Sequence, residues 1–149
     1  MIIFLAADHA GFELKLKLSE HLVHQGYEVE DIGPYTLDKE DDYPNYAYAL
    51  TTKILGSEDS DARGILLCGS GQGMAMAANR VAGIRAALAW NEDIAALARE
   101  HEDSNVLALP ARFIDSIQAF AITDTWLKTK FSQAPRHLRR LQEIEQLYG

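Results

Sequence analysis

The sequence contains one cysteine and no long apolar run. Cys68 is the only cysteine among 149 residues, which excludes an internal disulfide framework and a metal site built from several cysteines, and fits a reducing cytoplasm. The longest apolar runs are far shorter than the roughly 20 residues that span a bilayer. The first residues carry no basic segment and soon reach the charged Asp8, so we expect no signal peptide.

Basic residues are also scarce. The chain has 14 Lys and Arg against 22 Asp and Glu, a formal net charge of −8, which disfavours a general nucleic-acid or anionic-membrane surface. An anionic ligand would therefore need a local basic cluster. Repeats, low-complexity segments and linkers are absent, and 48% of the residues are hydrophobic. We expect one globular domain over residues 1–149.

Short apolar segments alternate along the chain with segments of helical pattern. The predicted strands are 2–7, 27–32, 64–67, 84–89 and 106–109. The predicted helices begin near residues 12, 44, 74, 91, 114 and 136. This alternation predicts an α/β fold with a five-stranded parallel sheet covered by helices on both faces. Ligands of such sheets bind beyond the carboxyl ends of the strands.

A glycine-rich turn follows the third predicted strand. The strand runs into Cys68, and Gly69, Gly71 and Gly73 come next, before a helix of small residues. Glycines let a backbone bend sharply and approach a ligand closely, and a helix N-terminus directs free N–H groups at an anion. The turn is therefore a candidate anion or oxyanion cradle beside a thiol. A tight strand–helix turn that binds nothing, with a buried structural cysteine, is the alternative.

Three familiar loop motifs fail at one position, Met74. A dinucleotide fingerprint requires a third glycine there, and a cysteine phosphatase loop of the C-x5-R kind requires arginine. A Walker A loop requires Gly-Lys-Ser/Thr at its end, but Met74 follows Gly73. The spacing thus speaks against nicotinamide, ATP and phosphatase functions.

Seven short patterns, the Cys68 loop among them, occur in a fixed order along the chain and together indicate a resemblance to a known family. They are Asp8-His9-Ala10-Gly11, Asp42-Tyr43-Pro44, Cys68-Gly69-Ser70-Gly71-Gln72-Gly73, Ala78-Asn79-Arg80, Gly83-Ile84-Arg85, Asn105-Val106-Leu107, and Arg136-His137 with Arg140. Over nearly its whole length the chain resembles the type B ribose-5-phosphate isomerases, in the sugar-phosphate isomerase family that includes the galactose-6-phosphate isomerase subunits. The resemblance implies a three-layer Rossmann-like fold, a homodimer or homotetramer with its site between subunits, and neither metal nor cofactor.

The implied reaction is an aldose–ketose isomerisation through an enediolate, and the resemblance assigns its proton transfers. The family's base is either the loop cysteine or a glutamate just beyond the last loop glycine. Met74 occupies that second position, so the resemblance assigns the base to Cys68. It assigns ring opening to His101 and Asp8. Without it, a histidine after a helix is more often a partner of the helix C-terminus. The loop amides and the Ser70 hydroxyl would stabilise the oxyanion.

The predicted substrate grip combines residues from several parts of the chain. Arg136 and Arg140 lie at i, i+4 on one helix face and form the basic cluster that an anionic ligand needs. A solvated face paired with Glu143 and Glu145 is the alternative. The resemblance implies a larger set of substrate-binding residues, namely His9, Tyr43, Gly69, Gly71, Gln72, Gly73, Glu102, Arg112, Arg136 and Arg140.

Two positions depart from the family pattern. Glu102 follows His101 where asparagine is usual, and a carboxylate there could repel an enediolate. Pro110 stands where a glycine is usual. The resemblance makes a cytoplasmic isomerase of ribose 5-phosphate and ribulose 5-phosphate the leading hypothesis. The two departures leave two alternatives open, which are the same chemistry on a hexose 6-phosphate (allose or galactose 6-phosphate) and a catalytically silent sugar-phosphate-binding module.

Overall fold

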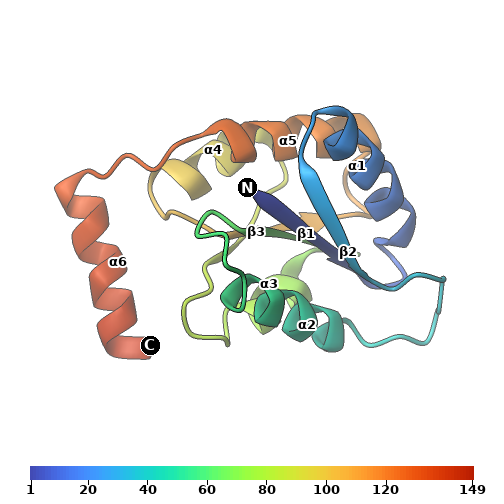
Figure 1. Cartoon of the computed structure of the whole chain (residues 1–149), viewed down its shortest axis with the longest axis horizontal. Coiled ribbons are helices and arrows are strands. Elements are labelled where there is room, and N and C mark those ends of the chain that lie inside the picture. The colour runs from blue at the N-terminus through green and yellow to red at the C-terminus, as the bar shows by residue number, and fades with distance from the viewer.

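The computed structural model describes all 149 residues and contains five strands and six helices (Figure 1). The strands are β1 Ile2–Ala7, β2 Glu28–Gly33, β3 Arg63–Cys68, β4 Ala86–Leu88 and β5 Val106–Pro110. The helices are α1 Phe12–His24, α2 Tyr43–Leu55, α3 Gln72–Ala78, α4 Glu92–Glu100, α5 Ser116–Lys128 and α6 Pro135–Tyr148. No helix combines the length and the apolar character needed to cross a membrane.

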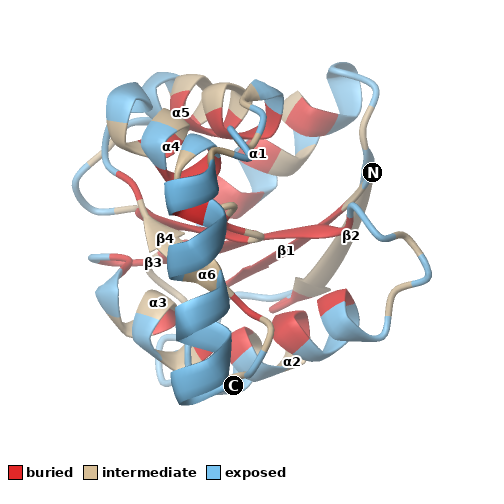
Figure 2. Cartoon of the chain, turned by 90° about the vertical axis from the view of Figure 1, so that its left-hand side faces the viewer, coloured by how far each residue is buried: buried red, intermediate tan, exposed pale blue.

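The strands form one parallel sheet in the order β2-β1-β3-β5-β4. Helices cover both faces of the buried sheet, with α1, α4 and α5 on one side and α2 and α3 on the other (Figure 2). The predicted three-layer α/β fold with a five-stranded parallel sheet is therefore confirmed.

Side-chain alternation along the strands divides the core in two. Ile3, Leu5 and Leu67 face one layer of helices, where they pack with the fully buried Trp126 of α5. The intervening residues, including Cys68, face α2 and α3. Both faces of the central strands are thus apolar, which explains why their sequences read as continuous hydrophobic runs rather than as alternating patterns.

Three elements begin two residues away from their predicted starts, and side-chain hydrogen bonds explain two of these shifts. α5 begins at Ser116 instead of 114, because Asp115 and Gln118 form a capping box with bonds of 2.7 and 2.9 Å to each other's backbone N–H. β4 is shorter than predicted, because the Asn105 side chain binds the backbone N–H of Arg85 and the carbonyl of Gly83 at its start.

The third difference concerns the predicted oxyanion loop. α3 begins at Gln72 rather than at Met74, because Gly71 is its N-cap and accepts the first helical bond, from Ala75, at 3.1 Å. The amides of Gln72 and Gly73 therefore belong to the first turn of the helix and not to the loop. Gly71 has φ +75°, a conformation that favours glycine.

A buried lysine holds the start of the long acidic connection between β2 and α2. Lys15 of α1 is fully buried, and its Nζ donates to Asp31 Oδ1 and to the Pro34 carbonyl, both at 2.6 Å. These bonds satisfy an ammonium group that would otherwise be costly to bury. The connection leaves this anchor and returns to the sheet's carboxyl edge before α2.

The last helix stands apart from the body of the fold (Figure 1). His137 is its only buried residue, while Leu138, Ile144, Leu147 and Tyr148 are all exposed. The connection before α6 is fastened to α4 by the Ser132 N–H, which donates to the Glu100 carbonyl at 3.0 Å. An amphipathic helix with an uncovered apolar face normally packs against another surface.

Candidate active site

The loops after β1 and β3 diverge at the centre of the sheet. β1 and β3 are neighbours, but α1 covers one face of the sheet and α3 the other. The Asp8 N–H donates to the Leu67 carbonyl at 3.0 Å, which places Asp8 beside Cys68. Such a topological switch point, at the carboxyl ends of the strands, is where open α/β sheets bind ligands.

Cys68 lies at this switch point. It is the last residue of β3, its thiol is free, and its residue surface is only 5% exposed. The N–H groups of Gly69, Ser70 and Gly71 have no acceptor within the chain. Ser70 is exposed, and its Oγ lies 3.4 Å from the Gln72 backbone nitrogen. The loop thus presents free donors next to a shielded thiol.

Two glycines of the loop make room for predicted substrate-binding side chains. A Cβ on Gly69 would lie 2.9 Å from Nη1 of Arg112, and one on Gly73 would lie 2.7 Å from Cζ of the Tyr43 ring. The Arg112 N–H also donates to the Gly69 carbonyl at 3.0 Å. The sequence places these side chains far apart, yet both lie directly against the glycine loop.

The first turn after β1 carries Asp8 and His9. Asp8 is buried, and its Oδ1 accepts from the N–H groups of Ala10 and Gly11 at 2.9 and 3.1 Å. His9 is half-buried, and its Nδ1 lies 2.7 Å from Oδ1 of Asp41. Asp8 is therefore fixed by its own turn, whereas His9 is fixed by a residue of the acidic connection.

Tyr46 of α2 lies near these carboxylates. Burial raises the pKa of its hydroxyl, and the carboxylates of Asp41, Asp38 and Asp8 raise it further. The shift further favours the protonated hydroxyl, which is also the form of an ordinary tyrosine at neutral pH. Neither Tyr46 nor Asp41 is predictable as a site residue from the sequence, because an acidic loop and a helical tyrosine carry no motif that distinguishes them from surface residues.

A second cluster of predicted site residues surrounds the start of α6. The His101 ring follows α4 and lies 4.3 Å, centroid to centroid, from the ring of His137. His137 is buried, and its Nδ1 shares a hydrogen bond of 2.7 Å with the Ser132 hydroxyl. Burial lowers the pKa of His137, and the positive charges of His101, Arg136 and Arg140 lower it further.

Arg136 and Arg140 are exposed, and neither forms an ion pair within the chain. The glutamates that could have neutralised them bind elsewhere, Glu143 near Arg139 at 4.0 Å and Glu145 near Arg85 at 3.8 Å. The alternative of a salt-bridged solvated face is therefore not what the structure shows. The two guanidinium groups are free to bind an anion.

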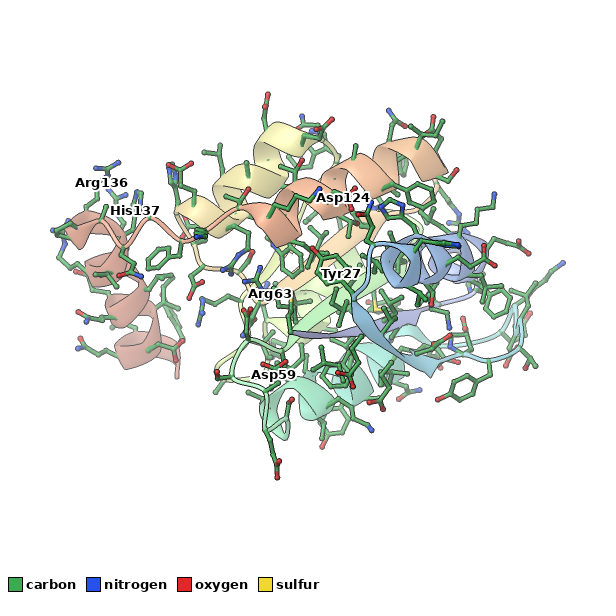
Figure 3. The ribbon with its side chains drawn as sticks, turned by 45° about the horizontal axis from the view of Figure 1, so that its top comes forward. Tyr27, Asp59, Arg63, Asp124, Arg136 and His137 are labelled. Atoms are coloured by element: carbon green, nitrogen blue, oxygen red, sulfur yellow. The ribbon has the colours of Figure 1, made fainter.

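Within one chain, the cluster around Cys68 and the cluster around His101 lie at opposite ends of the strands. Cys68 and Asp8 follow the carboxyl ends of strands, whereas α4 runs back across the sheet and leaves His101 close to the start of β5. In Figure 1, α6 lies beyond the end at which β1 begins. Figure 3 shows Arg136 and His137 at the outer end of the molecule, beyond Arg63, the first residue of β3.

A shallow cavity of about 460 Å³ adjoins the glycine loop on the side of β4 and β5. Its lining includes Ser70 and Gln72 together with the exposed side chains of Trp90 and Phe113. The cleft contains no basic side chain, so a phosphorylated ligand bound there would need cations from elsewhere. No three His, Cys, Asp or Glu side chains come together in a way that could hold a metal ion.

Comparison with known proteins identifies the family. The sequence model of the ribose/galactose isomerases matches residues 3–144. The chain belongs to the ribose/galactose isomerase family. Among the relatives of this isomerase, ribose-5-phosphate isomerase B of Mycobacterium tuberculosis is 43% identical over 141 residues, which cover 95% of this chain and 86% of the relative.

Solved structures of family members share the fold along almost the entire isomerase chain. A ribose 5-phosphate isomerase from Thermotoga maritima is 49% identical, covers 98% of both chains and superposes with a TM-score of 0.92. Ribose-5-phosphate isomerase B of Mycoplasma genitalium, solved with bound ribulose 5-phosphate, is 43% identical and also gives a TM-score of 0.92. That match covers 97% of this chain and 94% of the other.

The two unusual positions of this isomerase occupy different surroundings. Pro110 ends β5 opposite Cys68, and its nitrogen lies 3.2 Å from where a Cβ on Gly71 would stand. Glu102 is exposed and lines a cavity of about 360 Å³ beneath α6. Its carboxylate charge acts to raise the pKa of His137, against the stronger lowering effects. Glu102 therefore belongs to the histidine–arginine cluster, whereas Pro110 belongs to the thiol cluster.

Proposed function

We propose that this protein interconverts ribose 5-phosphate and ribulose 5-phosphate, at a site that two copies of the chain build together. The observation that carries the proposal is the match to the Mycoplasma genitalium enzyme with bound ribulose 5-phosphate over 97% of the chain. The free thiol of Cys68 beside the glycine loop and the unpaired arginines on α6 support it, because they can serve as the proton acceptor and the phosphate grip that this reaction requires.

In the proposed reaction, Cys68 moves the proton between C1 and C2 of the open-chain sugar. The thiolate removes the proton from the carbon next to the carbonyl and returns it to the neighbouring carbon. Negative charge accumulates on the sugar oxygens in the enediolate. The free N–H groups of Gly69, Ser70 and Gly71 can donate hydrogen bonds to those oxygens. Each such preorganised donor typically lowers the activation barrier by about 3 kcal/mol.

Opening of the furanose ring requires an acid and a base before isomerisation begins. Asp8 lies beside Cys68 and is held rigidly by two backbone N–H groups. In this proposal His101 of the second copy completes the pair, and its contact with the ring of His137 in that copy holds it in place. A histidine can donate or accept a proton near neutral pH, which suits reversible ring opening.

The proposed homodimer follows from the separation of the two clusters. Arginine binds phosphate oxygens strongly, but Arg136 and Arg140 lie at the sheet edge opposite the thiol of their own chain. A two-fold partner would bring its α6 to the basic-poor cleft beside the glycine loop, and the exposed apolar side chains of α6 would be covered at the same time. Arg112 and His9 would complete the grip from the first chain.

The function is tested by turnover of defined sugar phosphates. The purified protein, treated with EDTA, is incubated with ribose 5-phosphate, allose 6-phosphate and galactose 6-phosphate, and ketose formation is measured. We expect turnover of ribose 5-phosphate at the highest kcat/KM and no loss on EDTA treatment, because side chains alone perform the proposed proton transfers. Binding without turnover of any sugar would favour the silent sugar-phosphate-binding module. We place the enzyme in the cytoplasm, where its free thiol would stay reduced.

Glu102 gives specific support to a second candidate, a sugar-phosphate-binding module without turnover. Its carboxylate stands in the cluster that meets the sugar, and a negative charge there opposes an enediolate. If this charge limits ribose 5-phosphate turnover, Glu102→Asn should raise kcat/KM for that substrate about three- to tenfold, as expected when one unfavourable charge contact of roughly 1 kcal/mol is removed.

The matched control is Glu102→Gln, which removes the charge but keeps the side-chain length. Equal gains in both variants would assign the effect to charge, and a gain in Asn alone would assign it to size. Loss of ribose 5-phosphate turnover in both variants would show that the carboxylate assists the reaction.

A further inference from the structure

Asp41 is a buried carboxylate that the proposed reaction does not use. Its side chain is only 4% exposed, although it lies in the acidic connection between β2 and α2. Oδ1 accepts from the backbone N–H of His9 at 3.1 Å and lies 2.7 Å from Nδ1 of the same residue. Oδ2 is buried and has no hydrogen-bond partner.

The double contact fixes the His9 side chain. One carboxylate oxygen binds both the backbone and the ring of His9, so the ring cannot rotate without losing the shorter bond. Because Nδ1 is engaged, Nε2 is the only ring nitrogen left for a ligand. The identity of residue 41 therefore determines which His9 nitrogen meets the substrate and in which orientation.

A neutral side chain at position 41 could make the same two bonds. The oxygen of an asparagine would accept from the His9 backbone and from Nδ1–H without burying a charge. The carboxylate instead makes a charge-assisted bond to Nδ1 of His9, and such bonds are roughly twice as strong as neutral ones. The carboxylates of Asp41, Asp38 and Asp8 lie close enough together to raise the pKa of the Tyr46 hydroxyl.

We propose that Asp41 is a positioning residue that fixes the His9 ring through Nδ1 and leaves Nε2 to hydrogen-bond the phosphate group of the substrate. This inference rests on the proposed function, in which His9 contributes to the phosphate grip. It assigns Asp41 an effect on phosphate affinity and none on the proton transfer at carbon, because Cys68 performs that step.

The test uses Asp41→Asn, which keeps the acceptor oxygen and removes the charge. The KM for ribose 5-phosphate and the inhibition constant of inorganic phosphate should both rise about tenfold, the usual effect of one hydrogen bond to a charged group. The kcat should change less than twofold. In a His9→Gln background, Asp41→Asn should have no further effect on either constant. Asp38→Asn is the matched control, because Asp38 is an exposed carboxylate of the same connection whose Oδ1 only accepts from the Glu40 N–H.

Unchanged phosphate affinity in Asp41→Asn would overturn the inference, as would an effect that persists in the His9→Gln background. If Asp41→Asn does not fold, Asp41→Glu and Asp41→Gln replace it, since they differ in charge but not in length. Glu should then bind phosphate more tightly than Gln, and equal affinities would contradict the inference. Calorimetric binding of inorganic phosphate to these proteins gives the same comparison if ribose 5-phosphate is not turned over, so failure of the proposed function remains distinguishable.

Discussion

Replacement of Cys68 by alanine is expected to lower kcat for ribose 5-phosphate by about 10³-fold, the usual contribution of a positioned general base. The KM should change less than threefold, because the phosphate grip lies on other residues. Cys68 is buried at the end of β3. The neighbouring loop N–H groups are free to donate hydrogen bonds to the enediolate oxygens that its proton transfer makes negative. Initial rates over a range of ribose 5-phosphate concentrations separate the two constants.

Cys68→Ser is the matched control for this experiment. Serine preserves the approximate size of the side chain and its position against α2 and α3, but a hydroxyl ionises far less readily than a thiol. Its kcat should therefore be nearly as low as that of alanine, while its thermal unfolding stays close to that of the wild type. Wild-type kcat in the alanine variant would refute the assignment of the base.

Replacement of Arg136 and Arg140 together by glutamine is expected to raise the KM for ribose 5-phosphate by at least about 100-fold, because each charge-assisted hydrogen bond is worth about 1.5–3 kcal/mol. Neither guanidinium is paired within the chain, so the two substitutions remove ligand contacts rather than internal salt bridges. The kcat at saturating substrate should fall much less than the affinity.

Arg139 supplies the control on the same helix. It is exposed, and its Nε lies 4.0 Å from Glu143, so Arg139→Gln should leave the KM within twofold of the wild-type value. An unchanged KM in the double variant of Arg136 and Arg140 would show that the phosphate binds elsewhere. A rise of the same size in Arg139→Gln would indicate a general effect of net charge instead of a specific grip.

Local chemistry made much of the fold predictable. Continuous apolar runs predicted the central strands, because a parallel sheet buried on both faces needs no alternation. Boundaries were less accurate where side chains replace backbone partners. Asn105 shortens β4, and the capping box of Asp115 and Gln118 delays the start of α5. Gly71 begins α3 earlier because its own carbonyl is the first helical acceptor.

The candidate site was predictable only in part. Glycine spacing marked the Cys68 loop, and the i, i+4 arginines marked the anion grip. Asp41 escaped notice because its partner, His9, lies 32 positions away, and only the folded chain shows that the carboxylate is buried. His137 likewise acquires its environment from the Ser132 hydroxyl and the His101 ring. The direction of α4 places the two clusters at opposite ends of the strands. Residue patterns alone do not show that a second chain could bring the two clusters together.

The most direct test of a site shared by two copies is mixing of two impaired variants. Cys68→Ala lacks the base, and the double variant Arg136→Gln, Arg140→Gln lacks the grip. Equal amounts are unfolded, refolded together and assayed at a ribose 5-phosphate concentration far below the KM of the double variant. Random pairing makes half of the dimers mixed, each with one intact site, so about a quarter of wild-type activity should return. Activity no greater than the sum of the separate variants would contradict a shared site.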